Sequence, residues 1–183
     1  MKAMILAAGL GIRLLPLTQV LPKPLFPIIN RPVLKHTLEI LKKSGINEII
    51  ANLHHLPDKI VSCFGGEIHY SREEELLGTA GGIKKAETFL GNDSFVVING
   101  DILVDIDLQE ALAYHREKKS VLTLVVRKVD RPDQYEPIEI DDQGRIIKFP
   151  GTSGLAIGHG ITQVMFTGIQ IVEPEIYKRI PTK

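Results

Sequence analysis

Two glycines and two cations near the amino terminus could together hold a polyphosphate. Gly9 and Gly11 directly follow the apolar run 3–8, and Arg13 and Lys23 come after them. Glycine has no Cβ, so the backbone can turn tightly and its amide N–H groups can approach an anion closely. A guanidinium is planar, permanently charged and suited to phosphate oxygens. These residues predict a phosphate-binding loop, although on residue types alone a plain tight turn fits equally well.

The two best-known phosphate-binding motifs are excluded. A dinucleotide fingerprint requires a third glycine three positions after the second, and Leu14 occupies that position. Pro16 also argues against a helix beginning there. The P-loop needs Gly-Lys-Ser/Thr after four intervening residues, which this stretch lacks.

A candidate metal ligand follows a second apolar run, 95–99. The sequence there continues Asn99-Gly100-Asp101. An aspartate at the end of a strand is commonly a turn former or a helix cap. However, Mg²⁺ prefers one or two carboxylates together with substrate phosphates. Asp101 is therefore a candidate Mg²⁺ ligand, facing Arg13 across a crevice.

A third candidate is the string Leu-Gly-Thr-Ala-Gly-Gly at 77–82, which opens a predicted helix. Glycine and threonine at a helix start expose N–H groups, and Thr79 offers a capping hydroxyl; a plain helix cap explains the residues as well. The preceding run 72–75 is acidic. A carboxylate can accept hydrogen bonds from guanine, which favours GTP, but such a run is more often a solvated face.

The elements that must position these residues alternate between strand and helix. Strands are predicted at 3–8, 48–53, 67–71, 95–99, 121–126, 137–140, 145–149 and 164–172. Helices are predicted from Pro32 to just before Gly45 and at 57–64, 79–90, 107–118 and 173–180. The pattern indicates an α/β fold with a Rossmann-like, mostly parallel sheet and helices on both faces. In such a sheet, ligands bind at the carboxyl ends of the strands.

Composition limits the classes of partner. The 183 residues include 22 basic and 22 acidic ones, so no net charge attracts nucleic acid or an anionic membrane. No apolar run reaches the ~20 residues of a membrane helix, and no leader peptide is apparent. Cys63 is the only cysteine, which excludes an intrachain disulfide and fits a reducing cytoplasm. We expect one cytoplasmic domain spanning residues 1–183.

The stretch from Met4 to Leu25 closely resembles the signature of the sugar-1-phosphate nucleotidyltransferases, also called NDP-sugar pyrophosphorylases. Gly100-Asp101 and the Leu-Gly-Thr-Ala-Gly string at 77–81 resemble two further motifs of that family. The resemblance implies a nucleotide-diphospho-sugar transferase fold with Mg²⁺ as cofactor. It also implies a reaction in which a sugar-1-phosphate attacks the α-phosphorus of a nucleoside triphosphate and pyrophosphate leaves.

Carried over residue by residue, the resemblance also assigns roles. The catalytic cations would be Arg13, on the departing phosphates, and Lys23, on the sugar phosphate and the α-phosphate. The nucleotide would be lined by Leu6, Ala7, Ala8, Gly9 and Gly11, with Gly78 and Thr79 at the base. Asp101 would bind Mg²⁺, and Asn99 and Gly168 would bind the sugar substrate.

Three alternatives stay open. Some departures from the family pattern are similar to those of short uridylyltransferases, so UTP is expected beside GTP as a substrate. Family members usually continue to a Trp-x-Asp-x-Gly stretch with a second metal-binding aspartate, whereas this sequence contains no Trp. We therefore expect the carboxyl-terminal part of the family fold to be missing, and a catalytically weak nucleotide or nucleotide-sugar-binding regulatory module is the alternative function. A homo-oligomer is expected only because many relatives form one.

Overall fold

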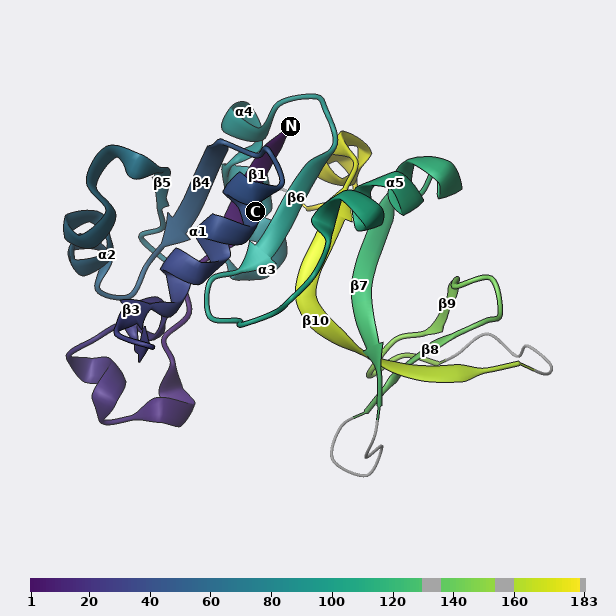
Figure 1. Cartoon of the computed structure of the whole chain (residues 1–183), viewed down its shortest axis with the longest axis horizontal. Coiled ribbons are helices and arrows are strands. Elements are labelled where there is room, and N and C mark those ends of the chain that lie inside the picture. Colours follow the sequence, from purple (N-terminus) through teal and green to yellow (C-terminus); the bar gives the residue numbers. More distant parts are fainter. Residues whose placement is uncertain (130–135, 154–159, 182–183) are drawn as a thin grey trace. The chain divides into compact units, whose positions relative to one another are not determined.

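The computed structural model describes residues 1–129, 136–153 and 160–181 and is drawn in Figure 1. Its contacts divide the chain into two compact units. The first is Met1–Thr123 with Ile169–Lys183, and the second is Leu124–Gly168. Because each unit is held by its own contacts, the expectation of a single domain stays a prediction.

The first unit is built on a parallel sheet. Its strands are ordered β5 (His69–Arg72), β4 (Glu48–Leu53), β1 (Lys2–Leu6) and β6 (Phe95–Asn99). The last residues of β10 (Thr162–Val172) pair antiparallel with β6. The register places Leu6 beside both Asn52 and Asn99. The carboxyl ends of three strands therefore meet at one edge, as the sequence predicts.

Helices cover both faces of this sheet. They are α1 (Val33–Lys43), α2 (Pro57–Phe64), α3 (Gly78–Lys85), α4 (Glu87–Leu90) and α5 (Leu108–Lys118). Figure 1 shows α1 and α3 on opposite sides of the sheet. Alternate residues of the strands explain this arrangement, because Met4 and Val97 pack in one core cluster with Ile83 of α3. The predicted α/β fold class is confirmed.

Some element boundaries differ from the prediction. The helix expected at 79–90 is two helices that meet at Ala86, and the helix expected at 173–180 is a 3-10 helix, Pro174–Lys178. Pro32 lies in the strand β3 (Arg31–Pro32), which pairs with β2 (Pro27–Ile28) in an unpredicted hairpin. Both turn residues of this hairpin, Ile29 and Asn30, have a positive φ. Turns of this kind typically contain Asn-Gly at these two positions.

The second unit contains β8 (Ile138–Ile140), β9 (Ile146–Lys148), most of β7 (Leu122–Lys128) and the first part of β10. β8 pairs antiparallel with β10 and with β9. The strands predicted at 137–140 and 145–149 are therefore confirmed, and they form an antiparallel hairpin. Gly168 belongs to this unit and has a φ of 94°.

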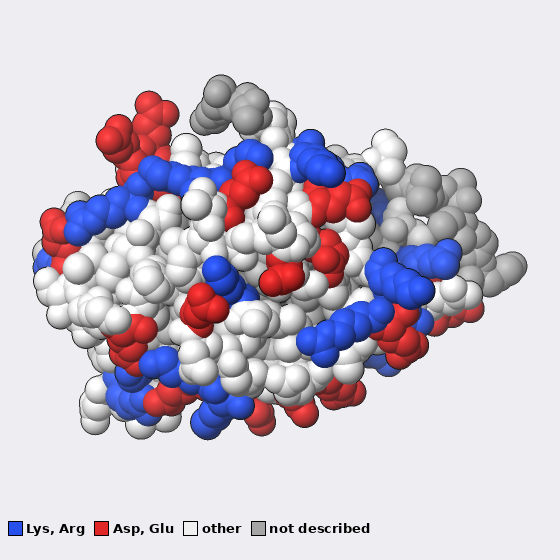
Figure 2. Space-filling model, turned by 90° about the horizontal axis from the view of Figure 1, so that it is seen from above, with Lys and Arg blue, Asp and Glu red and all other residues white. Residues whose placement is uncertain are grey.

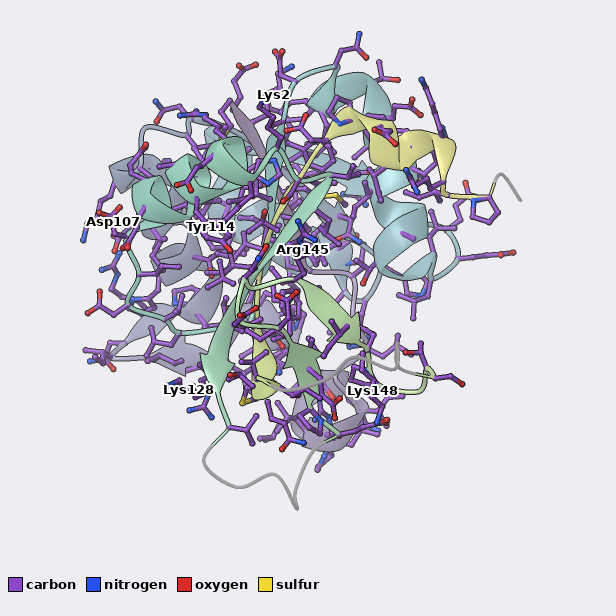
Figure 3. All side chains as sticks on the ribbon, turned by 90° about the vertical axis from the view of Figure 1, so that its right-hand side faces the viewer. Lys2, Asp107, Tyr114, Lys128, Arg145 and Lys148 are labelled. Carbon is purple, nitrogen blue, oxygen red and sulfur yellow. The ribbon has the colours of Figure 1, made fainter. Side chains whose placement is uncertain are left out.

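The surface carries charges of both signs. Lys and Arg side chains alternate with Asp and Glu over the face seen in Figure 2. Asp107, labelled in Figure 3, is the N-cap of α5, and its side chain accepts a hydrogen bond from the Gln109 N–H at 2.9 Å. Among the residues described, no helix has the length and apolar character needed to span a bilayer.

Candidate functional site

A pocket of about 640 Å³ lies in the first unit, beyond the ends of β1 and β6. It is lined by Leu6, Ala7, Gly9, Leu10, Gly11, Ile12, Arg13, Leu14, Lys23, Pro24, Leu76 and Asp101. Most of these residues belong to the loop that follows β1. The two predicted cations and the predicted metal ligand thus line the same pocket as the glycine loop.

The conformation of this loop requires glycine at position 11. Gly11 has a φ of 64°, in the left-handed region that favours glycine. A Cβ at this position would lie 2.7 Å from Cγ2 of Thr18. Thr18 is fully buried, and its hydroxyl donates to the Gly11 carbonyl at 3.1 Å. By contrast, a Cβ on Gly9 would meet nothing within 4 Å, so the backbone there faces open space.

Side chains around α2 anchor the far end of the loop. His55 Nε2 donates to the Thr18 carbonyl at 2.6 Å, and Lys59 Nζ donates to the Val20 carbonyl at 2.6 Å. The neighbouring His54 instead bonds the Glu73 carbonyl through Nδ1 at 3.0 Å. The adjacent histidines have separate partners, so they do not form a metal pair.

Asp101 approaches β1 because the residue before it is glycine. The Gly100 N–H donates to the Leu6 carbonyl at 2.9 Å. A Cβ on Gly100 would lie only 3.0 Å from Ile5 Cγ2 and 3.1 Å from the Leu6 carbonyl oxygen. Asp101 forms an ion pair with Lys23, and about a third of each side chain is exposed. The sequence did not predict this pairing between residues 78 positions apart.

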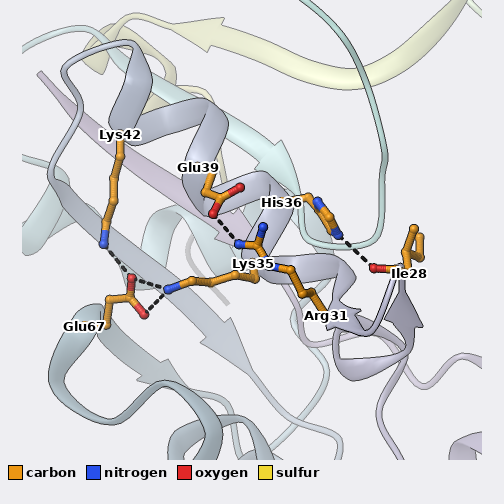
Figure 4. A network of polar contacts seen from close by, with 7 residues as sticks. All are labelled: Ile28, Arg31, Lys35, His36, Glu39, Lys42 and Glu67. Carbon is orange, nitrogen blue, oxygen red and sulfur yellow. Dashed lines mark hydrogen bonds and ion pairs between the residues drawn. The ribbon is translucent and has the colours of Figure 1, made fainter.

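The segment after Lys23 is held by α1. The hairpin β2–β3 docks on this helix through Arg31, which pairs with Glu39, and through His36 Nε2, which donates to the Ile28 carbonyl at 3.1 Å (Figure 4). The hydrogen bond from Arg31 lowers the pKa of the Glu39 carboxyl. These contacts fix the chain that leads away from the pocket.

A second ion network on α1 holds the 3-10 helix Gly65–Glu67, which precedes β5. Lys35 and Lys42 both donate to the carboxylate of Glu67, at 2.7 and 2.6 Å (Figure 4). The hydrogen bond from Lys35, followed by that from Lys42, lowers the pKa of Glu67 below its ordinary value. Both basic residues therefore stabilise the fold and do not face the pocket.

Gly78 and Thr79 lie at the start of α3 and are exposed. The capping hydroxyl expected from Thr79 is wrong, because α3 has Leu77 as its N-cap and no side chain caps it from that position. The Leu77 N–H is satisfied instead by the carboxylate of Glu73 at 3.1 Å. Neither Gly78 nor Thr79 lines the pocket, although Leu76 does.

Three other predicted residues also lie outside the pocket lining. Ala8 is 5% exposed, and Asn99 is half-buried at the end of β6. Gly168 belongs to the other unit. The structure therefore brings together seven of the predicted residues: Leu6, Ala7, Gly9, Gly11, Arg13, Lys23 and Asp101.

Sequence reasoning missed two buried polar residues behind the pocket, Asn52 and Glu73. They are 3% and 5% exposed. Asn52 lies within the apolar strand β4, which could have given the signal, because a buried amide in a strand needs a hydrogen-bonding partner. Glu73 was hidden in a run of charged residues that had the composition of a solvated face.

Comparisons with known proteins find a matching family model and similar sequences and structures. A family model described as nucleotidyl transferase matches residues 2–150. The UTP–glucose-1-phosphate uridylyltransferase of a Synechocystis species is 38% identical over 100% of the chain and 51% of its own length. The mannose-1-phosphate guanyltransferase of Aspergillus oryzae is 37% identical over 98% of the chain and 51% of its own length. The chain thus spans about half the length of these relatives.

Solved structures share the fold. HddC from Yersinia pseudotuberculosis, crystallised with GMP-PN, has a TM-score of 0.80 and 28% identity, covering 99% of this chain and 80% of its own. A putative glucose-1-phosphate thymidylyltransferase from Bacillus anthracis has a TM-score of 0.80 and 26% identity, covering 97% of this chain and 73% of its own.

Proposed function

The chain belongs to the nucleotidyl transferase family, and from this we propose that it transfers a nucleotidyl group from a nucleoside triphosphate to a sugar-1-phosphate. The observation that carries the proposal is the pocket in which Arg13, Lys23 and Asp101 meet the glycine loop. An oxygen of the sugar phosphate attacks the α-phosphorus, the bond to the β-phosphate breaks, and an NDP-sugar and pyrophosphate form.

Charge neutralisation is the main task of such a site, because both reactants are anionic. Arg13 would hold the departing β- and γ-phosphates, while Lys23 would neutralise the α-phosphate and the attacking sugar phosphate. Backbone N–H groups near Gly9 would approach the phosphates where no Cβ intervenes, while Gly11 gives the loop its left-handed turn. The protein then acts by alignment and electrostatic stabilisation, without a covalent intermediate.

Asp101 suits a Mg²⁺ ion that is held jointly by the protein and the substrate. Asp101 is the carboxylate that lines the pocket, and about a third of its side chain is exposed. One carboxylate together with phosphate oxygens is a combination that Mg²⁺ accepts. When bound, Mg²⁺ would withdraw negative charge from the phosphates. Lys23 pairs with Oδ2 of Asp101 and would compete with the ion for this carboxylate.

The resemblance to the family also suggests which residues contact the base and the sugar. We expect Gly78 and Thr79, exposed at the start of α3, to meet the base, and Leu6, Ala7 and Ala8 to line the nucleotide. Asn99 and Gly168 are the expected contacts to the sugar. GTP and UTP are both candidate substrates, since the similar relatives are named for guanylyl and uridylyl transfer.

The test is a pyrophosphate-release assay with each triphosphate against a panel of sugar-1-phosphates. We expect release with GTP or UTP, and a loss on the order of 10²-fold in turnover for Arg13→Ala and for Lys23→Ala. Lys43→Ala, which removes an exposed cation of α1 outside the pocket, is the matched control. Near-normal rates in either pocket variant would refute its assignment. Triphosphate binding without any release would favour the regulatory alternative.

Cytoplasmic location, homo-oligomerisation and a single domain stay predictions. Cell fractionation, size-exclusion chromatography with light scattering, and a calorimetric unfolding profile test them in that order.

A further inference from the structure

A continuous hydrogen-bonded chain links the end of β1 to the start of α3. Oδ1 of Asn52 accepts from the Ala7 N–H at 2.9 Å, and Nδ2 of Asn52 donates to Oε1 of Glu73 at 2.7 Å. The other carboxylate oxygen, Oε2 of Glu73, accepts from the Leu77 N–H at 3.1 Å. Two side chains thereby join a backbone N–H at the pocket to a backbone N–H one residue before the Gly78-Thr79 pair.

The surrounding atoms leave these hydrogen-bonded side chains no room to move. A Cβ on Gly82 of α3 would lie 2.9 Å from Asn52 Nδ2 and 2.9 Å from Glu73 Oε1, so the helix backbone packs directly against the pair. The backbone of Glu73 is also fixed, because its N–H donates to the Leu53 carbonyl at 2.7 Å and its carbonyl bonds His54. A buried, hydrogen-bonded polar group of this kind specifies one geometry.

We propose that Asn52 and Glu73 are positioning residues that set the distance and orientation between the phosphate loop and the amino terminus of α3. The inference rests on the proposed function, in which the loop holds the triphosphate and α3 meets the base. Holding both ends of one nucleotide requires that the two backbone segments keep a fixed spacing, since misplaced catalytic groups lose rate steeply.

The same contacts remove Glu73 from the role that its acidic neighbourhood suggests. Both of its carboxylate oxygens are engaged and the residue is 5% exposed, so it is not free to accept from a guanine base. Glu74 and Glu75 are exposed. If the acidic run contributes to base selection, those two residues do so, and Glu73 supports the backbone.

A reciprocal exchange of amide and carboxylate tests the proposal. In Glu73→Gln, the new amide can satisfy Asn52 or Leu77 but not both, because one of its ends is a donor. In Asn52→Asp, two carboxylates face each other, so one of them gains a raised pKa. In the double variant, the carboxylate introduced at position 52 would accept from the Ala7 N–H and from the amide introduced at position 73, and the oxygen of that amide would accept from the Leu77 N–H. Every hydrogen bond and the net charge are then restored.

The readouts separate positioning from simple stability. We expect Glu73→Gln to raise the KM for the triphosphate on the order of 10-fold, as expected when a polar contact in an aligned site is lost. The ratio of GTP to UTP turnover stays unchanged. Asn52→Asp loses activity as the pH rises and the second carboxylate ionises, whereas the wild type does not. The double variant recovers the wild-type KM and pH profile. Glu117→Gln, at an exposed carboxylate of α5 outside the pocket lining, is the matched control and leaves the KM unchanged.

The opposite results overturn the proposal. A double variant no better than the single variants, or a Glu73→Gln protein with an unaltered KM, would refute the positioning role. A double variant that regains its thermal stability but changes its base preference would show that Glu73 reads the base. Wild-type protein that releases no pyrophosphate would refute the proposed function alone. Amide hydrogen exchange at Ala7 and Leu77 in the ligand-free variants would then test this inference. We expect exchange to be faster in the single variants and to return to the wild-type rate in the double variant.

Discussion

Replacing Gly11 with alanine measures how tightly the phosphate loop is built. Two effects add in Gly11→Ala. A residue with a Cβ at a φ of 64° costs roughly 1–2 kcal/mol. A Cβ placed 2.7 Å from Cγ2 of the buried Thr18 must push that methyl group aside, which costs about 1–3 kcal/mol in a packed site. The expected loss is therefore about 2–5 kcal/mol of the free energy of unfolding.

Two further variants separate the effects. Gly45 has a φ of 78° and its Cβ would meet nothing within 4 Å, so Gly45→Ala should show only the backbone cost, about 1–2 kcal/mol. Thr18→Ser removes the methyl group that would clash and keeps the hydroxyl that donates to Gly11. The loss in free energy of unfolding caused by Gly11→Ala should therefore be smaller in the Thr18→Ser background than in the wild type, by at least about 1 kcal/mol.

Urea unfolding followed by circular dichroism gives these values, provided that the slope with denaturant stays constant. The triphosphate KM, measured in the same variants, should rise for Gly11→Ala because the displaced loop lines the pocket. Equal destabilisation by Gly11→Ala and Gly45→Ala would refute the predicted clash. An effect of Gly11→Ala that is identical with threonine or serine at position 18 would refute the assignment of the clash to the methyl group.

Three further changes test the energetics elsewhere in the fold. Ile29 is β-branched, 84% exposed and held at a φ of 51°, so Ile29→Asn should stabilise the protein by about 1 kcal/mol, measured as a higher Tm. Tyr177 is buried with no hydrogen-bonding partner for its hydroxyl among the described residues, and burial raises its pKa to about 12. Tyr177→Phe should therefore leave stability unchanged or raise it by up to about 1 kcal/mol in urea unfolding. The pKa of Glu67 is lowered by Lys35 and Lys42, so its stabilising contribution is complete above its ordinary value of 4.5 and is lost as the pH falls through the lower value. The stability difference between wild type and Glu67→Gln should accordingly shrink on acidification below that pH, and a difference that grows instead would contradict the assignment.

Strands buried on both faces were predictable because their runs are short, apolar and bounded by turn residues. β4 and β6 have the predicted bounds, and β1 spans Lys2–Leu6 where a strand at 3–8 was expected. The β2–β3 hairpin was missed because its turn uses Ile29-Asn30, and no local pattern marks an isoleucine at positive φ as a turn residue. The break at Ala86 was missed for a similar reason, since alanine favours helix and the break follows from packing beyond the local sequence.

The candidate site also contains features that the sequence predicts and features that it does not. Asp101 could be placed opposite Arg13 from topology, because parallel strands end at one edge of the sheet, whereas the pairing of Lys23 with Asp101 could not. The Asn52–Glu73 pair could not, since a side-chain hydrogen bond between β4 and the segment before α3 depends on register and rotamers. Sequence patterns thus locate the groups that face the ligand more readily than those that hold the backbone behind it.

The ion pair between Lys23 and Asp101 determines which charges the pocket presents to a ligand. While the two are paired, they contribute no net charge, and Arg13 is the remaining charged side chain of the lining. On the proposed function, the oxygens of an incoming triphosphate would compete with Asp101 for Lys23, and the carboxylate would then be available to share a cation with the phosphates. Before the ligand arrives, each of the two charges has the other as its partner, which matters because an unpaired charge in a partly desolvated site is costly. The proposed function therefore predicts that binding of the triphosphate and availability of the Asp101 carboxylate are coupled.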